Sequence, residues 1–120
     1  MMKSSRLTNG AAVLAAGLWL VGAAAPSAHA EEARQTYDKL CVSCHGPAGK
    51  GDGPASKMLK PPPSDLSATA KTASEADLTK IIKEGGKAVG RSPAMPAYGA
   101  KLDTDQVNGL VQLLKGFSGK

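Results

Sequence analysis

The sequence predicts an all-α domain in which short helices are joined by long loops. Three segments, at 31–44, 74–84 and 103–115, place apolar residues three or four positions apart, the spacing that puts them on one face of an α-helix. The stretches between them, at 46–73 and 87–100, are rich in glycine and proline, which interrupt regular helices. A chain of 120 residues forms one domain at most.

The first 30 residues have the features of a secretory signal peptide. Lys3 and Arg6 are followed by an uncharged apolar run at 11–25, and Ala28-His29-Ala30 matches the A-x-A pattern that precedes signal cleavage. As a helix the run would span about 22 Å, short of the roughly 30 Å of hydrocarbon in a bilayer. We therefore predict a signal peptide at 1–30, a functional domain at 31–120, export to the periplasm, and no membrane span after cleavage. An uncleaved anchor is the alternative.

Without the leader the chain carries a small positive charge. The 15 basic residues of the whole chain become 13 when Lys3 and Arg6 are removed, against 10 acidic residues. The lysines are scattered and aromatic residues are nearly absent, which is not the pattern of a nucleic-acid-binding protein. So few large apolar side chains predict that a bulky apolar cofactor completes the core.

The first predicted helix carries the only two cysteines of the chain. The motif Cys41-Val42-Ser43-Cys44-His45 places two thiols at positions i and i+3, on one helix face, and an imidazole directly after the second. Thiols at this spacing can each form a thioether with one vinyl group at the edge of a haem, while the imidazole reaches the iron. The motif therefore predicts one covalently bound haem c, attached by Cys41 and Cys44 and ligated by His45.

A C-x-x-C pair also occurs in redox dithiols and in zinc sites. A thioredoxin-like dithiol is expected among alternating strands and helices, a pattern that this chain lacks. A zinc site needs further Cys or His ligands, and the only other histidine, His29, lies in the predicted leader.

The segment at 46–73 is predicted to be an irregular loop that wraps the cofactor. Gly46-Pro47 should end the first helix, and Pro61-Pro62-Pro63 forms a stiff, extended stretch suited to lining a ring. Its expected apolar contacts are Met58, Leu59 and Leu66.

Two capped helices complete the prediction. Ser74 and Asp77 form a capping-box-like start, and Gly85-Gly86 ends that helix. Asp103 and Gln106 form a second capping box at the start of the last helix, which is expected to end at Gly116. The predicted buried faces consist of Leu78, Ile81 and Ile82 in the earlier helix and Val107, Leu110, Val111 and Leu114 in the last.

Gly109, inside the last helix, has two interpretations. It either permits close packing against Ala33 or Tyr37 of the first helix, or it occupies a tolerant surface position.

The second axial position of the iron has several candidate ligands. Once the leader is removed these are Met58, Met95, a lysine, a tyrosine or water. A thioether is a soft donor that favours ferrous iron and raises the reduction potential. Met95 lies in a proline-stiffened loop before a capped helix, which favours it as the ligand, and Met58 is expected to pack in the core. The residues alone leave the choice open.

The sequence resembles the class I monohaem c-type cytochromes of bacteria over 31–120. The likeness rests on the cysteine motif running into Gly46, a glycine-rich piece, a proline stretch and a Met-Pro pair, at 41–46, 49–54, 61–66 and 95–96. The resemblance implies a cytochrome c-like fold, with short helices and long loops wrapped around one covalent haem and with the first and last helices crossing. It also implies His45 and Met95 as axial iron ligands.

The resemblance extends to the surroundings of the ligands. A backbone carbonyl in the Gly46-Pro47 region is expected to hold the other ring nitrogen of His45. Tyr37 stands where the family has an aromatic residue in the first helix, whereas its partner in the last helix is expected to be aliphatic in this chain.

We expect a periplasmic electron carrier, not an enzyme, that passes one electron between a donor and an acceptor protein. It would act as a monomer or as a subunit of a larger oxidoreductase complex. The remaining alternatives are a haem sensor or enzyme with an open sixth iron position, and a thiol–disulfide protein. Lysines expected near the exposed haem edge are Lys50, Lys57, Lys87 and Lys101.

Overall fold

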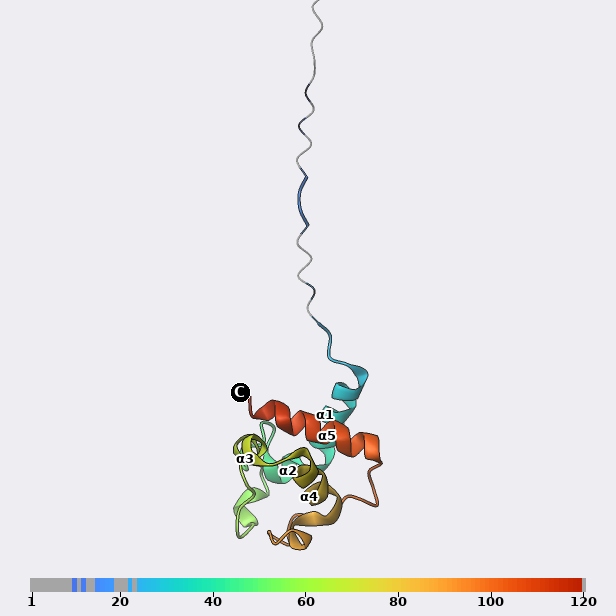
Figure 1. Cartoon of the computed structure of the whole chain (residues 1–120). Coiled ribbons are helices and arrows are strands. Elements are labelled where there is room, and N and C mark those ends of the chain that lie inside the picture. Colours follow the sequence, from blue (N-terminus) through green and yellow to red (C-terminus); the bar gives the residue numbers. More distant parts are fainter. Residues whose placement is uncertain (1–9, 11, 13–14, 19–21, 23, 120) are drawn as a thin grey trace, which may run out of the picture.

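The computed structural model describes residues 10, 12, 15–18, 22 and 24–119. Over these residues the chain forms five α-helices and one short 3₁₀ helix, with no strand, which confirms the all-α prediction (Figure 1). The predicted n-region of the leader, with Lys3 and Arg6, lies outside the described residues, as does part of its apolar run.

Helices in the described part of the chain are all too short or too polar to cross a membrane.

The cysteine motif follows a break between two helices, α1 (Ala28–Leu40) and α2 (Val42–His45). We predicted one helix from 31 to 44, but the helix is interrupted at Cys41, whose φ of −117° is far from the usual α-helical value. The helix also begins earlier than predicted because the Ser27 side chain accepts a hydrogen bond from the Ala30 N–H at 3.2 Å. Gly46, with φ of 78°, ends α2 as expected.

The segment at 46–73 is more ordered than predicted, because it contains the 3₁₀ helix η1 (Ser56–Met58) and α3 (Leu66–Thr72). Asp65 starts α3, since its carboxylate accepts from the N–H groups of Ser67 and Ala68 at 2.9 and 3.3 Å. At its other end, the Lys115 ammonium donates to the carbonyls of Ala70 and Ala73. A seven-residue helix is too short to show a clear apolar periodicity in the sequence.

Both predicted capping boxes are present, at the starts of α4 (Glu75–Ala88) and α5 (Thr104–Phe117). Gly85 leaves helical geometry with φ of 82°, as expected at a helix end, but a further helical turn runs on to Ala88. The predicted end of α5 at Gly116 is wrong, because the helix continues to Phe117 and Ser118 is its C-cap.

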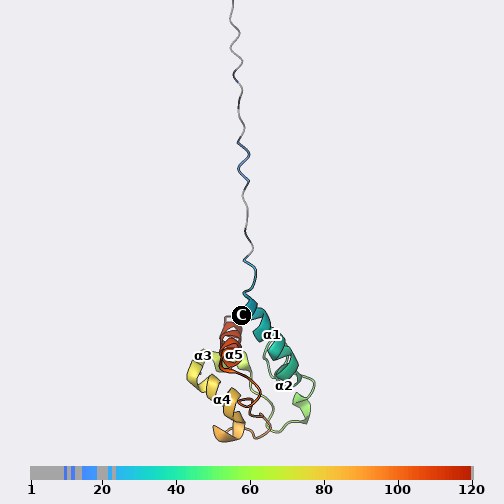
Figure 2. The ribbon, with the colours of Figure 1, turned by 90° about the vertical axis from the view of Figure 1, so that its right-hand side faces the viewer.

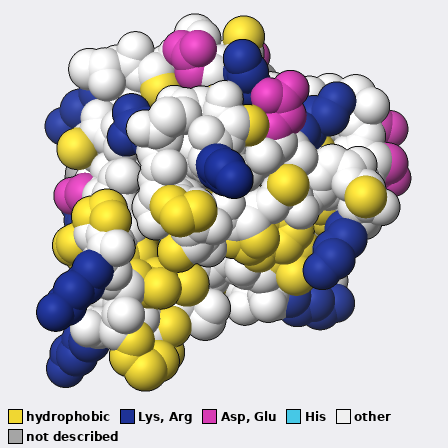
Figure 3. Space-filling model, turned by 90° about the horizontal axis from the view of Figure 1, so that it is seen from below, with side chains coloured by type: hydrophobic (Ala, Val, Ile, Leu, Met, Phe, Trp, Pro, Cys, Tyr) yellow, Lys and Arg dark blue, Asp and Glu magenta, His cyan; other side chains and the backbone are white. Residues whose placement is uncertain are grey.

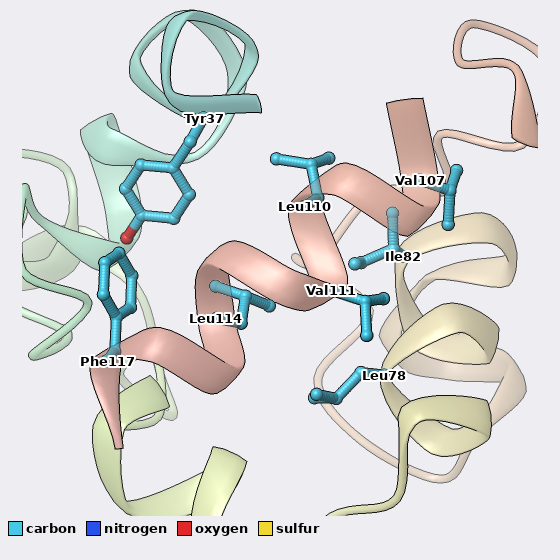
Figure 4. Packing of buried hydrophobic residues seen from close by; sticks show 8 residues of the cluster. All are labelled: Tyr37, Leu78, Ile82, Val107, Leu110, Val111, Leu114 and Phe117. Atoms are coloured by element: carbon cyan, nitrogen blue, oxygen red, sulfur yellow. The ribbon is translucent and has the colours of Figure 1, made fainter. Parts of the chain in front are cut away.

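The core forms around α5, which lies between α1 and α4 (Figures 1 and 2). The four predicted residues of its apolar face are buried and pack with Tyr37 of α1 and with Leu78 and Ile82 of α4 (Figure 4). The first and last helices cross, as the resemblance implies. The partner of Tyr37 in α5 is aromatic, contrary to our expectation: Phe117 meets it edge to face, with ring centroids 5.4 Å apart.

Gly109 lies where α5 approaches α1. A Cβ atom at this position would be 3.2 Å from the Ala33 Cβ, closer than ordinary van der Waals contact. Ala33 is itself buried. The structure therefore favours close helix packing over a tolerant surface position.

Replacement of Gly109 by leucine should push α1 and α5 apart. We expect the free energy of unfolding to fall by about 1–3 kcal/mol, as in other overpacked cores. Gly116→Leu is the matched control, because a Cβ there meets no atom within 4 Å. Chemical denaturation should show the control at or slightly above wild-type stability, and equal losses in both variants would contradict close packing at Gly109.

Candidate functional site

A cavity of about 850 Å³ lies beside the core, within the range of volumes typical of ligand sites. Viewed from below, hydrophobic side chains gather across the middle of this face, and lysine and arginine side chains stand at its edges (Figure 3). The large aliphatic and proline residues that line the cavity are Leu40, Leu59, Pro61, Pro62, Pro63, Leu66, Leu78, Ile81, Ile82, Val89, Pro96, Leu102, Leu110 and Leu114.

The structure brings the four predicted site residues to this one cavity. Cys41, Cys44 and His45 line it together from a single helical turn, in which the N–H groups of Cys44 and His45 donate to the Cys41 carbonyl at 3.2 and 2.9 Å. Met95 lines it from the loop after α4. Neither cysteine forms a disulfide, and both are partly exposed.

The two methionines weighed as ligands occupy different environments. Met95 is half-buried in the cavity wall. Met58 is 80% exposed and does not line the cavity, so its expected packing role is wrong. The η1 turn directs Met58 outward and leaves its neighbour, Leu59, to form part of the wall.

Two glycines allow the Met95 loop to lie against the end of α4. The Met95 carbonyl accepts from the Gly86 N–H at 3.0 Å, and the Met95 N–H donates to the Ser92 carbonyl at 3.2 Å. A Cβ at Gly85 would be 3.0 Å from the Met95 carbonyl oxygen, and one at Gly86 would overlap the Ser92 carbonyl. The glycine pair that we predicted as a helix end therefore also makes room for this loop.

The surroundings of His45 favour its neutral form. Burial lowers the pKa of its imidazole, and the Ser64 backbone partly opposes this effect. Neutral imidazole is the form that ligates a metal. The structure does not form the expected hydrogen bond from the Gly46-Pro47 region, and the buried His45 Nδ1 has no hydrogen-bond partner.

The carbonyls expected to hold His45 are bonded to other groups. The Gly46 oxygen accepts from the Tyr37 hydroxyl at 2.7 Å and from the Gly49 N–H at 3.1 Å. The Pro47 oxygen accepts from the Arg34 guanidinium at 2.9 Å. Tyr37 thus fixes the backbone next to His45 rather than the imidazole itself.

Thiol–disulfide exchange and zinc binding both fit this site poorly. Burial, with a smaller effect from Cys44, raises the pKa of the Cys41 thiol to about 11. Such a thiol is protonated at neutral pH, whereas exchange requires a thiolate. Within the described residues, no group of three or more His, Cys, Asp or Glu side chains is placed to hold a metal ion.

Comparison with protein families gives a match to the model described as "Cytochrome C oxidase, cbb3-type, subunit III" over residues 28–114. The chain belongs to this family. It is a c-type cytochrome, a class that transfers electrons, and its cofactor is covalently bound haem c. A comparison with curated proteins found no match.

The cavity of this cytochrome fits haem c on three counts. It has the volume and apolar wall that a large flat ring needs, the chain's only two thiols stand on its wall, and a neutral imidazole follows the second thiol. The shortage of large apolar side chains in residues 31–120 has the same explanation, because the ring supplies the missing core surface.

Sequence analysis alone missed the charged and hydroxyl groups at the cytochrome's cavity. Lys80, Arg91 and Tyr98 line the cavity. The four lysines predicted near the haem edge are exposed but do not line it. Lys80 follows Asp77 by three residues, a spacing that places both side chains on one face of a helix. This spacing could have predicted that Lys80 lies on the same surface as Asp77, which also lines the cavity.

The stability of the cytochrome should depend on Tyr37 at alkaline pH. Burial raises the pKa of Tyr37 from 10 to about 12, so the folded state favours the protonated phenol. This contribution is fully present below pH 10 and is lost as the pH rises from about 10 to about 12.

We therefore expect the unfolding free energy of the wild type to fall more steeply than that of Tyr37→Phe across this interval. Below it, the variant should be less stable by about 0.5–1.5 kcal/mol, because its hydrogen bond to Gly46 is lost. Denaturant titrations at a series of pH values measure both effects. Parallel pH profiles would show that Tyr37 is not protonated preferentially in the folded state.

Proposed function

We propose that this c-type cytochrome is a periplasmic one-electron carrier and not an enzyme. In this proposal Cys41 and Cys44 attach haem c, and His45 and Met95 ligate its iron. The observation that carries the proposal is that these four side chains line one apolar cavity although Met95 is far from the cysteine motif in the sequence. When bound, haem c supplies an iron that alternates between the ferric and ferrous states.

The roles of the four residues follow from their chemistry. Each thiol would add across one vinyl group, with the sulfur forming a bond to one vinyl carbon and the hydrogen going to the other, so that no atom is lost. The neutral imidazole would donate a lone pair to the metal. The Met95 thioether is a soft donor that favours the reduced metal and therefore raises the potential.

Methionine ligation separates a carrier from a sensor or enzyme. With His45 and Met95 both bound, no coordination position is left open for a small molecule. The half-burial of Met95 in the cavity wall supports this assignment over Met58, which is exposed.

A second candidate is a cytochrome subunit of an oxidase complex, because the matched family is described as subunit III of a cbb3-type oxidase. Both roles require docking to another redox protein. Lysines are exposed near the cavity, including Lys57 beside Met58, and they would favour a partner with an acidic surface. Purification of the native protein distinguishes the roles, since a subunit remains with its complex and a carrier elutes alone.

Export would require removal of the leader at 1–30. The A-x-A pattern ends at Ala30, within the first turn of α1, so cleavage would leave α1 starting at Glu31. An acidic residue is favourable at a helix N-terminus, and the shortened helix would retain the buried Ala33 and Tyr37.

Met95→Ala tests the proposed ligand set, with Met58→Ala as the matched control. The ferrous wild type should resist carbon monoxide, whereas Met95→Ala should bind it readily and have a lower reduction potential. Met58→Ala should leave both properties unchanged, and it should cost little stability because the side chain is 80% exposed.

Visible spectra under carbon monoxide and potentiometric titration provide the readouts. A wild type that binds carbon monoxide as readily as Met95→Ala would replace the carrier with a sensor or an enzyme. Opposite behaviour of the two variants would make Met58 the ligand.

A further inference from the structure

Tyr98 connects the Met95 loop to the C-terminal end of α1, directly before Cys41. It lies three residues after Met95, lines the cavity and is half-buried. Its hydroxyl donates to the carbonyl of Leu40 at 3.1 Å, and Leu40 directly precedes Cys41. This hydrogen bond therefore joins two parts of the cavity wall that are 58 residues apart in the sequence.

The other long-range hydrogen bonds of this loop all lead to α4. Gly86 donates to the Met95 carbonyl at 3.0 Å, Tyr98 donates to Ile82 at 2.9 Å, and Gly99 donates to Lys83 at 3.0 Å. Pro93 and Pro96 have no N–H group to contribute. Among the hydrogen bonds of the described residues, that of the Tyr98 hydroxyl is the one that ties the 92–99 loop to α1.

We infer that Tyr98 is a positioning residue whose hydrogen bond to Leu40 keeps the Met95 loop closed over the cofactor cavity. The inference rests on the proposed function, in which Met95 is an iron ligand. A loop that is hydrogen-bonded only to α4 can move away from α1. A loop that is bonded to both α4 and α1 cannot do so without breaking the Tyr98 hydrogen bond.

The size of the effect follows from the hydrogen bond that would be lost. A partly buried hydroxyl–carbonyl hydrogen bond stabilises the closed loop relative to the open one. Its removal should therefore raise the population of the open loop about three- to tenfold. Tyr98→Phe removes the hydroxyl and keeps the ring in the cavity wall. Ser118→Ala is the matched control, because it also removes a hydroxyl that donates to a backbone carbonyl, that of Lys115 at 2.6 Å, but at a residue that does not line the cavity.

Two measurements on the haem-loaded protein test the inference. The first is the rate of carbon monoxide binding to the ferrous form, which requires Met95 to leave the iron. The second is hydrogen exchange of the Gly86 amide, whose bond to the Met95 carbonyl breaks when the loop opens. Both should increase about three- to tenfold in Tyr98→Phe and should stay at wild-type values in Ser118→Ala.

The outcomes separate the inference from the proposed function. Wild-type values for both measurements in Tyr98→Phe, or equal increases in the two variants, would overturn the positioning role and leave Met95 ligation intact. A wild type that already binds carbon monoxide freely would overturn Met95 ligation, and the inference with it.

Discussion

Burial of apolar surface around the cofactor cavity is the constraint on which the rest of this structure depends. Among the described residues, Tyr37 and Val107 are the largest side chains that are less than 2% exposed, and the core cluster is essentially one face of α5 with its neighbours. The cavity beside this cluster measures about 850 Å³ and has a mainly apolar wall. A haem ring in that space completes a core that the chain's own side chains leave thin.

Local backbone signals then place the chemical groups around the cavity. Gly46 ends α2 directly after His45, so the motif residues stay on one turn facing the cavity. Gly85 and Gly86 allow the Met95 loop to approach α4. Two tyrosine hydroxyls hold the backbone around the cavity. Tyr37 donates to the carbonyl of Gly46, next to His45, and Tyr98 donates to the carbonyl of Leu40, next to Cys41. The site thus combines short-range turns with a few side-chain bonds across the cavity.

The features predicted correctly from the sequence are those that depend on residues close together in the chain. The capping boxes, the apolar face of α5 and the cysteine motif each depend on residues a few positions apart, and all appear in the structure. Features set by distant contacts were missed or wrong, including the outward position of Met58, the contact of Tyr37 with Phe117 and the hydrogen bond from Tyr98 to Leu40. Helix α3 was missed because its seven residues are stabilised by Asp65 and Lys115 rather than by an apolar stripe.

The most direct test of this account compares the unfolding of the haem-loaded protein with that of a haem-free Cys41→Ala/Cys44→Ala double variant. Intact mass should show one haem on the wild type, retained under denaturing conditions, and none on the variant. Far-UV circular dichroism should then give cooperative unfolding for the wild type and a broad, weak transition for the variant, because its cavity is unfilled. A haem-free variant that unfolds as cooperatively as the wild type, at the same denaturant concentration, would contradict the claim that the cofactor completes the core.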